Sequence, residues 1–362
     1  MSSEQTTNRE AQFFMQRCLQ LAANGLATTA PNPMVGAVVV HEGRIIGEGW
    51  HRQAGLPHAE PQAIASVKCQ ELLPESTLYV SLEPCAHYGK TPPCADLIVE
   101  KRIPRVVIGC LDPFPAVSGK GLQRLQQAGI ETVVGVEEQA CRWLNRRFFR
   151  YHLSHRPYIV LKWAQSQDGF IDRPRQDESQ GPAIFSTPFT AMAVHQLRTQ
   201  CDAVMVGTRT ALMDNPALTC RLWPAQRQPL RIVLDREAAL PARLKVFDDS
   251  CPTLVFNEKL DRRQGNTEWI PLYRLEDILD ELYRRQVQTL LVEGGSHLHQ
   301  SFIDHGLWDE IRVETSPESL GHGHPAARLP REVNDGKCLK HIWQPTDNAN
   351  TVTTFFRKPV SE

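Results

Sequence analysis

The sequence predicts an α/β protein of two domains, and three observations support this fold class. The chain has 362 residues, more than a single hydrophobic core usually supports. Short apolar runs typical of strands alternate with segments of helical periodicity in two successive series, one before residue 152 and one from residue 158 onward. The intervening segment, Ser154–Pro157, has the composition of a linker.

The first series begins with an amphipathic helix over residues 10–26, where apolar residues recur at helical spacing. A hairpin follows, with its turn at His41–Arg44. We expect strands at Val35–Val40, Ile45–Trp50, Leu78–Leu82, Arg105–Cys110 and Ile130–Val136. We expect helices that open at Pro57–Pro61 and that cover Cys94–Lys101, Gly119–Ala128 and Glu137–Tyr151. This alternation predicts a layered domain with a mostly parallel sheet.

The second series repeats the alternation and predicts a second α/β domain. Its expected strands are Tyr158–Ala164, Ala203–Gly207, Arg231–Leu234, Thr253–Phe256, Thr289–Val292 and Glu310–Glu314. Its expected helices are Pro188–Thr199, Leu275–Gln286 and His297–His305. The tail from about Asp335 carries no clear pattern.

Composition argues against several classes of partner. The net charge is −1 and charged residues of both signs are mixed, which indicates neither nucleic-acid nor membrane binding. Arginines alternate with aromatic residues over 142–150, and we favour an amphipathic helix there over a nucleic-acid contact. The first nine residues are polar and unlike a signal sequence, so we expect a cytoplasmic protein whose ten cysteines are thiols or metal ligands.

The chemistry is indicated by one histidine, two cysteines and a glutamate. His58 and Glu60 form an H-x-E motif, and eight residues separate Cys85 from Cys94 in a P-C…C motif. One imidazole and two thiolates leave a zinc ion one open position for water, and zinc brings the pKa of that water near 7. Apart from the longer gap between the cysteines, the motifs match the signature of zinc deaminases, in which the glutamate transfers protons.

The spacing of His58 and Glu60 needs an explanation, because positions i and i+2 do not share a helix face. Both residues can face one metal if they lie in the first turn of a helix, and Pro57 and Pro61 favour a helix start at this point. If Cys94 opens its own helix after Pro92-Pro93, the helix dipole is expected to lower the pKa of its thiol.

The gap Cys85–Cys94, together with Pro31-Asn32-Pro33-Met34-Val35-Gly36, resembles the bacterial bifunctional deaminase/reductase family of riboflavin biosynthesis. The second half resembles the reductase of that family at Leu161-Lys162, Ser166, Asp168-Gly169, Asp214-Asn215-Pro216, Leu218-Thr219, Arg221 and Val292-Glu293-Gly294-Gly295. The resemblance implies a cytidine-deaminase-like domain at 1–152 and a dihydrofolate-reductase-like domain at 157–362. It also implies zinc and NADPH as cofactors.

The implied substrate is 2,5-diamino-6-(5-phosphoribosylamino)pyrimidin-4(3H)-one, which is deaminated and then reduced at its ribosyl side chain. The resemblance implies deaminase substrate contacts at Asn32, His51, His87, Lys90 and Asp112. It implies reductase substrate contacts at Lys162, Arg198, Leu218, Arg221 and Glu293. Cofactor contacts are implied at Ala164, Thr210, Asp214 and Gly295. Backbone N–H groups of the turn Gly207–Thr210 and of Glu293–Ser296, which opens a helix, suit cofactor phosphates.

The chain departs from the family pattern at several positions. Phe114 replaces the asparagine of a D-P-N-P motif, and Pro182–Ser186 replaces S-x-W-I-T after an insertion that contains Arg173–Glu178. Glu318 stands where a lysine is usual. The missing serine and tryptophan alter the expected contacts with substrate and cofactor, so a deaminase with a non-catalytic, reductase-like binding domain is the alternative. A deaminase of nucleic acids or free nucleosides, or a purely structural zinc completed by His87, fits the sequence less well. We also expect a homo-oligomer, a dimer or a tetramer.

Overall fold

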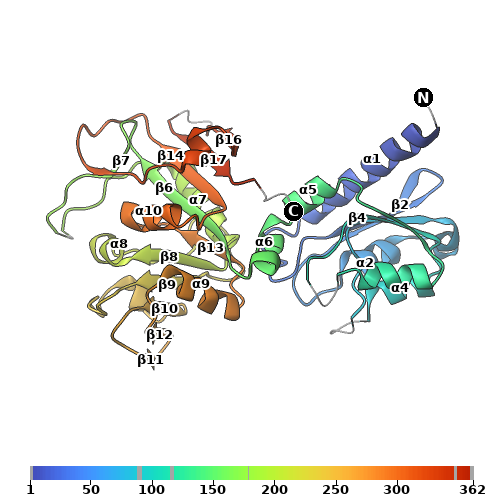
Figure 1. Cartoon of the computed structure of the whole chain (residues 1–362), viewed down its shortest axis with the longest axis horizontal. Coiled ribbons are helices and arrows are strands. Elements are labelled where there is room, and N and C mark those ends of the chain that lie inside the picture. The colour runs from blue at the N-terminus through green and yellow to red at the C-terminus, as the bar shows by residue number, and fades with distance from the viewer. Residues whose placement is uncertain (1–2, 88–91, 115–117, 178, 346–348, 359–362) are drawn as a thin grey trace. The chain divides into compact units, whose positions relative to one another are not determined.

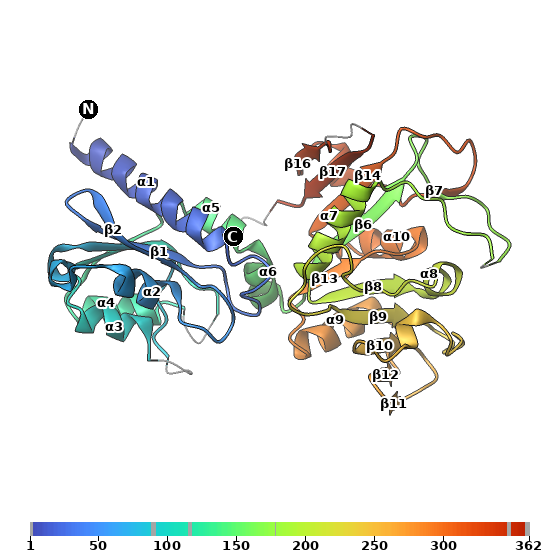
Figure 2. The same ribbon diagram turned by 180° about the vertical axis from the view of Figure 1, so that it is seen from behind.

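The computed structural model describes residues 3–87, 92–114, 118–177, 179–345 and 349–358. The chain divides into two compact units, Met1–His155 and Arg156–Glu362. Each unit is a β-sheet covered by helices on both faces (Figures 1 and 2). Within the described ranges, every helix is too short or too polar to span a lipid bilayer.

The sheet of the N-terminal unit has five strands in the order β2-β1-β3-β4-β5. They are β1 (Gly36–His41), β2 (Arg44–Trp50), β3 (Thr77–Leu82), β4 (Arg105–Cys110) and β5 (Glu131–Val134). Strands β3, β4 and β5 are parallel, whereas β1 runs antiparallel to both of its neighbours. Four of the five strands therefore run in the same direction, and the sheet is mostly parallel as expected, with β1 as the exception. A short turn can join only antiparallel strands, so the β1–β2 hairpin fixes one antiparallel pair.

Helices form a layer on each face of this sheet. One face is covered by α1 (Ser3–Ala23), α5 (Glu138–Leu144) and α6 (Arg146–Ser154), and the other by α2 (Ala59–Ser66), α3 (Cys94–Glu100) and α4 (Lys120–Gln127). Side chains of β1 alternate between the two cores, as strand geometry requires. Gly36 lets α1 approach this strand, because a Cβ atom there would lie 2.1 Å from the carbonyl oxygen of Cys18.

The segment expected to form one helix at Glu137–Tyr151 is two helices, α5 and α6, with a break at Asn145. The buried Asn145 amide donates to the carbonyl of Met34 and accepts from its N–H, both at 2.8 Å. A side chain committed to another loop in this way favours a helix break. Phe148 and Phe149 are buried and Arg142 pairs with Glu138, which agrees with an amphipathic helix.

The C-terminal unit contains a sheet of ten strands in the order β11-β12-β10-β9-β8-β13-β6-β14-β17-β16. In chain order the strands are β6 (Tyr158–Gln165), β8 (Ala203–Gly207), β9 (Leu230–Leu234), β10 (Thr253–Phe256), β11 (Arg262–Gln264), β12 (Thr267–Ile270), β13 (Thr289–Val292), β14 (Glu310–Thr315), β16 (Leu339–Trp343) and β17 (Thr351–Phe356). The strands from β12 to β14 in this order are parallel. Separately, β7 (Phe170–Asp172) pairs with β15 (His324–Pro325).

Two helical layers enclose this sheet as well. Helices α9 (Leu275–Arg284) and α10 (Ser296–Asp304) pack on one face, and α7 (Pro188–Thr199) and α8 (Thr208–Asp214) on the other. The expected turn Gly207–Thr210 is instead the start of α8, with Gly207 as its N-cap. Helix α11 (Arg331–Asn334) comes just before the tail without a clear pattern, and that tail supplies the antiparallel strands β16 and β17.

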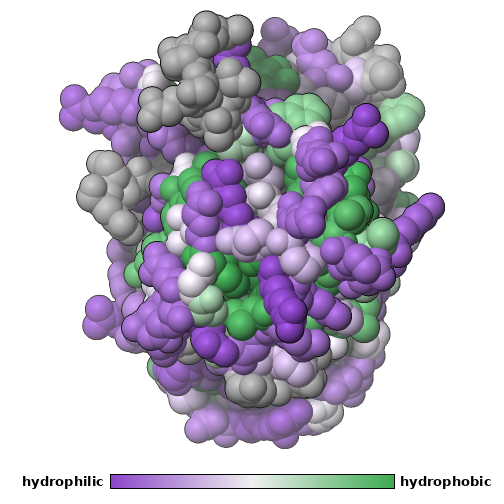
Figure 3. Space-filling model, turned by 90° about the vertical axis from the view of Figure 1, so that its right-hand side faces the viewer, coloured by the Kyte–Doolittle hydropathy of each residue, from purple (hydrophilic) through white to green (hydrophobic). Residues whose placement is uncertain are grey.

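The surface is predominantly hydrophilic on the face drawn in Figure 3, where hydrophobic areas gather near the middle. This mixture is ordinary, because polar groups cannot cover the whole surface of a folded protein.

Candidate zinc centre and reductase cavity

His58, Cys85 and Cys94 meet at the ends of three separate segments of the N-terminal unit. His58 is the N-cap of α2, Cys85 follows β3, and Cys94 is the first residue of α3. The sulfur atoms of Cys85 and Cys94 lie 3.6 and 3.4 Å from Nδ1 of His58. All three ligand atoms lie within 4.8 Å of one another, which suits a single zinc ion.

The ligand group contains three residues, and His87 is not among them. Across the described ranges, no fourth histidine, cysteine, aspartate or glutamate belongs to this group. A structural zinc is closed by four protein ligands, whereas a catalytic zinc has three and keeps a position for water. The arrangement is therefore that of a catalytic zinc site.

The two cysteine thiols have opposite pKa shifts. A hydrogen bond from Cys94 is the largest cause that lowers the pKa of Cys85 to about 4, with His58 adding to the effect. The same hydrogen bond, followed by burial, raises the pKa of Cys94. The expected lowering of the Cys94 pKa is therefore wrong, because the bond to Cys85 and burial outweigh its place at a helix start. Zinc binds thiolates, so zinc binding would release the proton that the two sulfur atoms share.

Glu60 lies in the first turn of α2, two residues after the ligand His58, and is only 3% exposed. Burial raises the pKa of its carboxyl to about 7, and the nearby Cys85 adds to the rise. A carboxyl with this pKa can both accept and donate a proton near neutral pH. The expected placement of His58 and Glu60 at a helix start is confirmed.

Three of the expected substrate contacts surround the zinc ligands. The amide nitrogen of Asn32 lies 3.1 Å from Nε2 of His51, and the rings of His51 and His58 meet edge to face at 5.3 Å. Since Nδ1 of His51 donates to the carbonyl oxygen of Pro57, Nε2 accepts from Asn32. Both Asp112 and His51 are buried. Burial raises the pKa of Asp112 to about 6, with Glu83 and Cys85 contributing.

The remaining two expected contacts are His87 and Lys90. His87 is exposed, and Lys90 lies outside the described residues. Phe114, which replaces an asparagine of the family motif, is half exposed and packs against the ring of His152.

One functional residue that the sequence analysis missed is Glu83, at the end of β3 and two residues before Cys85. Its buried carboxylate accepts from the N–H groups of Asp112 at 3.3 Å, Gly119 at 3.0 Å and Leu122 at 3.1 Å. Glu83 thus ties the loop that carries Asp112 to the strand that carries a zinc ligand. Its place directly before the P-C motif was the signal available.

The C-terminal unit holds a cavity of about 1180 Å³ at the carboxyl ends of β6, β8 and β13. Ligands of open α/β sheets bind at this edge. Six of the nine expected reductase contacts line it: Lys162, Ala164, Thr210, Asp214, Glu293 and Gly295. The segment Pro182–Ser186, which departs from the family pattern, also lines this cavity.

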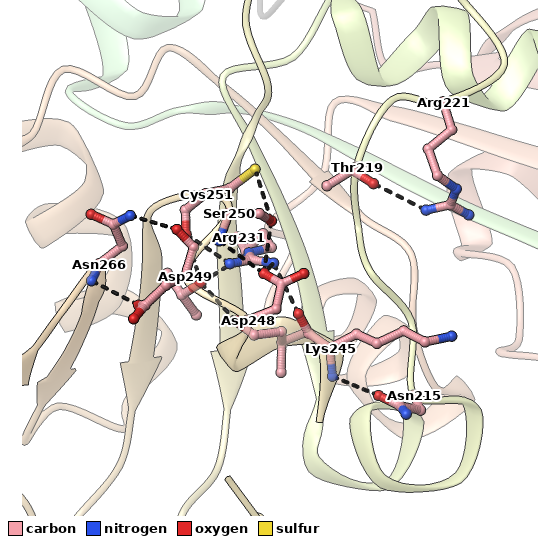
Figure 4. A network of polar contacts seen from close by, with 12 residues as sticks. Asn215, Thr219, Arg221, Arg231, Lys245, Asp248, Asp249, Ser250, Cys251 and Asn266 are labelled. Carbon is pink, nitrogen blue, oxygen red and sulfur yellow. Dashed lines mark hydrogen bonds and ion pairs between the residues drawn. The ribbon is translucent and has the colours of Figure 1, made fainter. Parts of the chain in front are cut away.

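The three other expected contacts, Arg198, Leu218 and Arg221, are not among the lining residues. Leu218 is buried, with a positive φ of 54°. Arg198 donates through Nη1 to the carbonyl oxygen of Thr219 at 2.8 Å, and its other donors bind Glu293. Arg221 is exposed and donates to the hydroxyl of Thr219 at 3.0 Å (Figure 4).

Lys162 lies between two acidic side chains. Its Nζ is 3.7 Å from Oε2 of Glu314, which is 2% exposed. Burial opposes ionisation of Glu293, but Arg198 and then Lys162 outweigh burial and lower its pKa. Glu314 also accepts from Ser186 at 2.7 Å and from Asn350 at 2.5 Å. The spacing of these residues in the sequence gives no signal that Glu314 would meet Ser186 and Asn350.

Two family models match the chain. Residues 8–110 match the cytidine and deoxycytidylate deaminase zinc-binding region, and residues 157–341 match the RibD C-terminal domain. The chain is 42% identical over 319 residues to the riboflavin biosynthesis protein RibD of Aquifex aeolicus. This alignment covers 86% of this chain and 88% of the relative. It is 36% identical over 331 residues to RibD of Escherichia coli K12, and this alignment covers 86% of this chain and 88% of the relative.

Solved structures agree with these matches. A diaminohydroxyphosphoribosylaminopyrimidine deaminase/5-amino-6-(5-phosphoribosylamino)uracil reductase of Thermotoga maritima superposes with a TM-score of 0.85 at 36% identity, covering 97% of this chain and all of the other. RibD of Acinetobacter baumannii superposes with a TM-score of 0.84 at 31% identity, again covering 97% and 100%. Both solved structures thus have the same two units in the same order as this chain.

Proposed function

The chain belongs to the RibD family of bifunctional deaminase/reductases in riboflavin biosynthesis, and on this premise we propose which residues carry each reaction. It combines a pyrimidine deaminase and a pyrimidine reductase. We assign deamination to a domain of residues 1–152 and reduction to a domain of residues 157–362. The alternation of elements and the linker near Ser154 support this division.

The deaminase acts on 2,5-diamino-6-(5-phosphoribosylamino)pyrimidin-4(3H)-one. Zinc held by His58, Cys85 and Cys94 supplies a Lewis acid that lowers the pKa of water. Glu60 takes a proton from the attacking water and delivers it to the departing amine, for which its pKa of about 7 is suited. The observation that carries this proposal is the burial of Glu60 in the turn that begins with a zinc ligand.

The substrate pocket of the deaminase is formed by polar side chains near the zinc ligands. Asn32 and His51 hold each other in position and face the pyrimidine, while Asp112 accepts hydrogen bonds from the substrate. His87 and Lys90 are proposed as contacts of the ribose phosphate. A lysine is suited to this role as a positive charge on a flexible side chain.

The reductase uses NADPH, which the cavity of the C-terminal unit binds through Ala164, Thr210, Asp214 and Gly295. Gly295, with a φ of +76°, is the N-cap of the nine-residue helix α10, whose first-turn N–H groups suit a phosphate. On the substrate side we propose Lys162 and Glu293, which line the cavity, together with Leu218 and Arg221. Arg198 holds Glu293 in place through their ion pair.

A coupled assay tests both reactions. The diaminopyrimidine phosphate is supplied with and without NADPH, and the mass of the product is measured. Deamination replaces an amino group by an oxygen and raises the mass by one unit, and reduction adds two more. A gain of one unit with NADPH present would instead support the alternative, a deaminase with a non-catalytic binding domain.

The choice of cofactor has its own test. Titration of the full chain with NADPH and NADH, followed by cofactor fluorescence, is expected to show tighter binding of NADPH. Equal dissociation constants would contradict the assignment of the phosphorylated cofactor.

We further propose a homo-oligomer in the cytoplasm. Strand β16 is an edge of the ten-stranded sheet and exposes Leu339, Ile342 and Trp343. An exposed apolar edge strand favours pairing with another chain. The ten cysteines form no disulfide with one another, which supports the proposal of a reducing compartment. Light scattering of the purified chain tests the oligomer.

A further inference from the structure

Arg175 lies in the segment that the sequence analysis identified as an insertion, and its side chain reaches the wall of the reductase cavity. The Arg175 side chain is 8% exposed. Nε donates to Oδ2 of Asp172 at 2.7 Å, and Nη2 pairs with Oδ1 of Asp214. Nη1 donates to the carbonyl oxygens of Met213 at 3.1 Å and Gln180 at 3.2 Å. This one side chain thus connects the inserted segment, β7 and the end of α8.

The backbone beside Asp214 is held from another direction. The next residue, Asn215, adopts a left-handed conformation with a φ of 41°, and its side-chain oxygen accepts from the N–H of Lys245 at 2.7 Å. The carbonyl of Lys245 in turn accepts from the fully buried Arg231 at 3.0 Å. Figure 4 shows this network. With its backbone fixed in this way, Asp214 depends on Arg175 for the orientation of its carboxylate.

The charges around Arg175 matter for a cofactor that carries several phosphate groups. Asp172 and Asp214 both line the cavity, and each brings a negative charge toward the same ligand. Burial raises the pKa of Asp214, and Arg175 offsets part of this rise by stabilising the carboxylate. The three side chains together carry one net negative charge, and without Arg175 they carry two. Repulsion between like charges is strong where water is partly excluded.

We propose that Arg175 is a positioning residue of the reductase, which orients Asp214 and cancels one of the two carboxylate charges that face the phosphates of the cofactor. The inference rests on the proposed binding of NADPH in this cavity. It assigns a role to a segment that departs from the family pattern, next to positions where a serine and a tryptophan of that pattern are replaced.

Three variants of the full chain test the charge argument: R175M, D172N and the double variant R175M/D172N. The dissociation constant of NADPH is measured for each by fluorescence titration. R175M leaves two uncompensated carboxylates and is expected to weaken binding about tenfold or more. D172N removes a negative charge and is expected to bind as tightly as the unaltered chain or a few-fold more tightly. The double variant restores the original net charge and is expected to recover most of the lost affinity.

A merely structural tether makes the opposite prediction for two of these variants. Both R175M and D172N break the contact between Arg175 and Asp172, so D172N would weaken binding and the double variant would be no better than R175M. That pattern would overturn the proposal. R175K keeps the charge and is expected to stay within a few-fold of the unaltered chain. Equal unfolding midpoints of the variants exclude misfolding as the cause, and deamination serves as an internal control in the other unit.

The inference and the cofactor assignment fail in distinguishable ways. If the unaltered chain bound no NADPH, the cofactor assignment and this inference would both be overturned. If the unaltered chain and R175M bound NADPH equally well, only the role of Arg175 would be lost.

Discussion

Arg198 and Glu293 form a two-pronged ion pair, with Nε to Oε1 at 2.7 Å and Nη2 to Oε2 at 2.6 Å. Both side chains are only 11% exposed. Glu293 lines the reductase cavity, whereas Arg198 approaches it from helix α7. The pair therefore joins the helical layer on one face of the sheet to the site at the end of β13.

Breaking this pair on one side is expected to cost more than removing both partners. R198M leaves a buried carboxylate unpaired and should lower the free energy of unfolding by about 3 kcal/mol. R198M/E293Q should recover part of this loss, because neither charge remains. Urea unfolding of the full chain measures both effects. Equal stability of R198M and the unaltered chain would show that the pair does not hold the unit together.

Replacement of Glu60 by glutamine is expected to abolish deamination without loss of zinc. Glutamine keeps the shape of the side chain but cannot transfer the proton, and loss of a general acid–base typically lowers the rate by about a hundredfold or more. Product mass and zinc content are measured on the same sample. E100Q, an exposed change on the helix that carries Cys94, is the matched control and should leave both unchanged. Loss of metal from E60Q would contradict the assigned role.

Removal of zinc by a chelator is expected to stop deamination and to spare reduction. The three zinc ligands belong to the N-terminal unit, and the reductase cavity lies in the other. The reduction step is followed by NADPH oxidation with the deaminated intermediate as substrate. Loss of both activities on chelation, with recovery of both on addition of zinc, would show that the units do not act independently.

The stability of the C-terminal unit is expected to fall as the pH falls from about 6.5 to 4. Burial lowers the pKa of His299 from 6.5 to about 4. In this window the unfolded chain binds a proton that the folded chain does not, so the free energy of unfolding decreases by about 3 kcal/mol. Urea unfolding at several pH values measures the slope. H299N should reduce the slope, and an unchanged slope would exclude His299 as its origin.

The sequence predicted the zinc site well because its signals are local. His58 and Glu60 lie in one turn, and prolines mark the start of that turn. Cys94 follows two prolines and opens α3 as expected. Most strands of both sheets were also predictable, since buried parallel strands are continuous apolar runs such as Thr289–Val292.

Features that depend on contacts between distant segments were not predictable. Strand β16 is exposed along its whole length and lacks the buried apolar run of an inner strand, and it is a strand because it pairs with β17. The break at Asn145 depends on Met34, more than a hundred residues earlier in the chain. The role of Arg175 depends on Asp214, which no spacing rule connects to it. Tertiary contacts decide such features, and local propensity does not record them.

The position of Asn350 has a consequence for synthesis of the protein. This residue donates to Glu314 and to the carbonyl oxygen of Phe185, and β17 directly after it completes the sheet beside β14. Domains generally fold in the order in which the ribosome releases them. The deaminase can therefore be complete while translation continues, whereas the reductase must wait until Asn350 and β17 have been translated. A nonsense mutation before Asn350 is expected to convert the bifunctional enzyme into a deaminase that releases its intermediate.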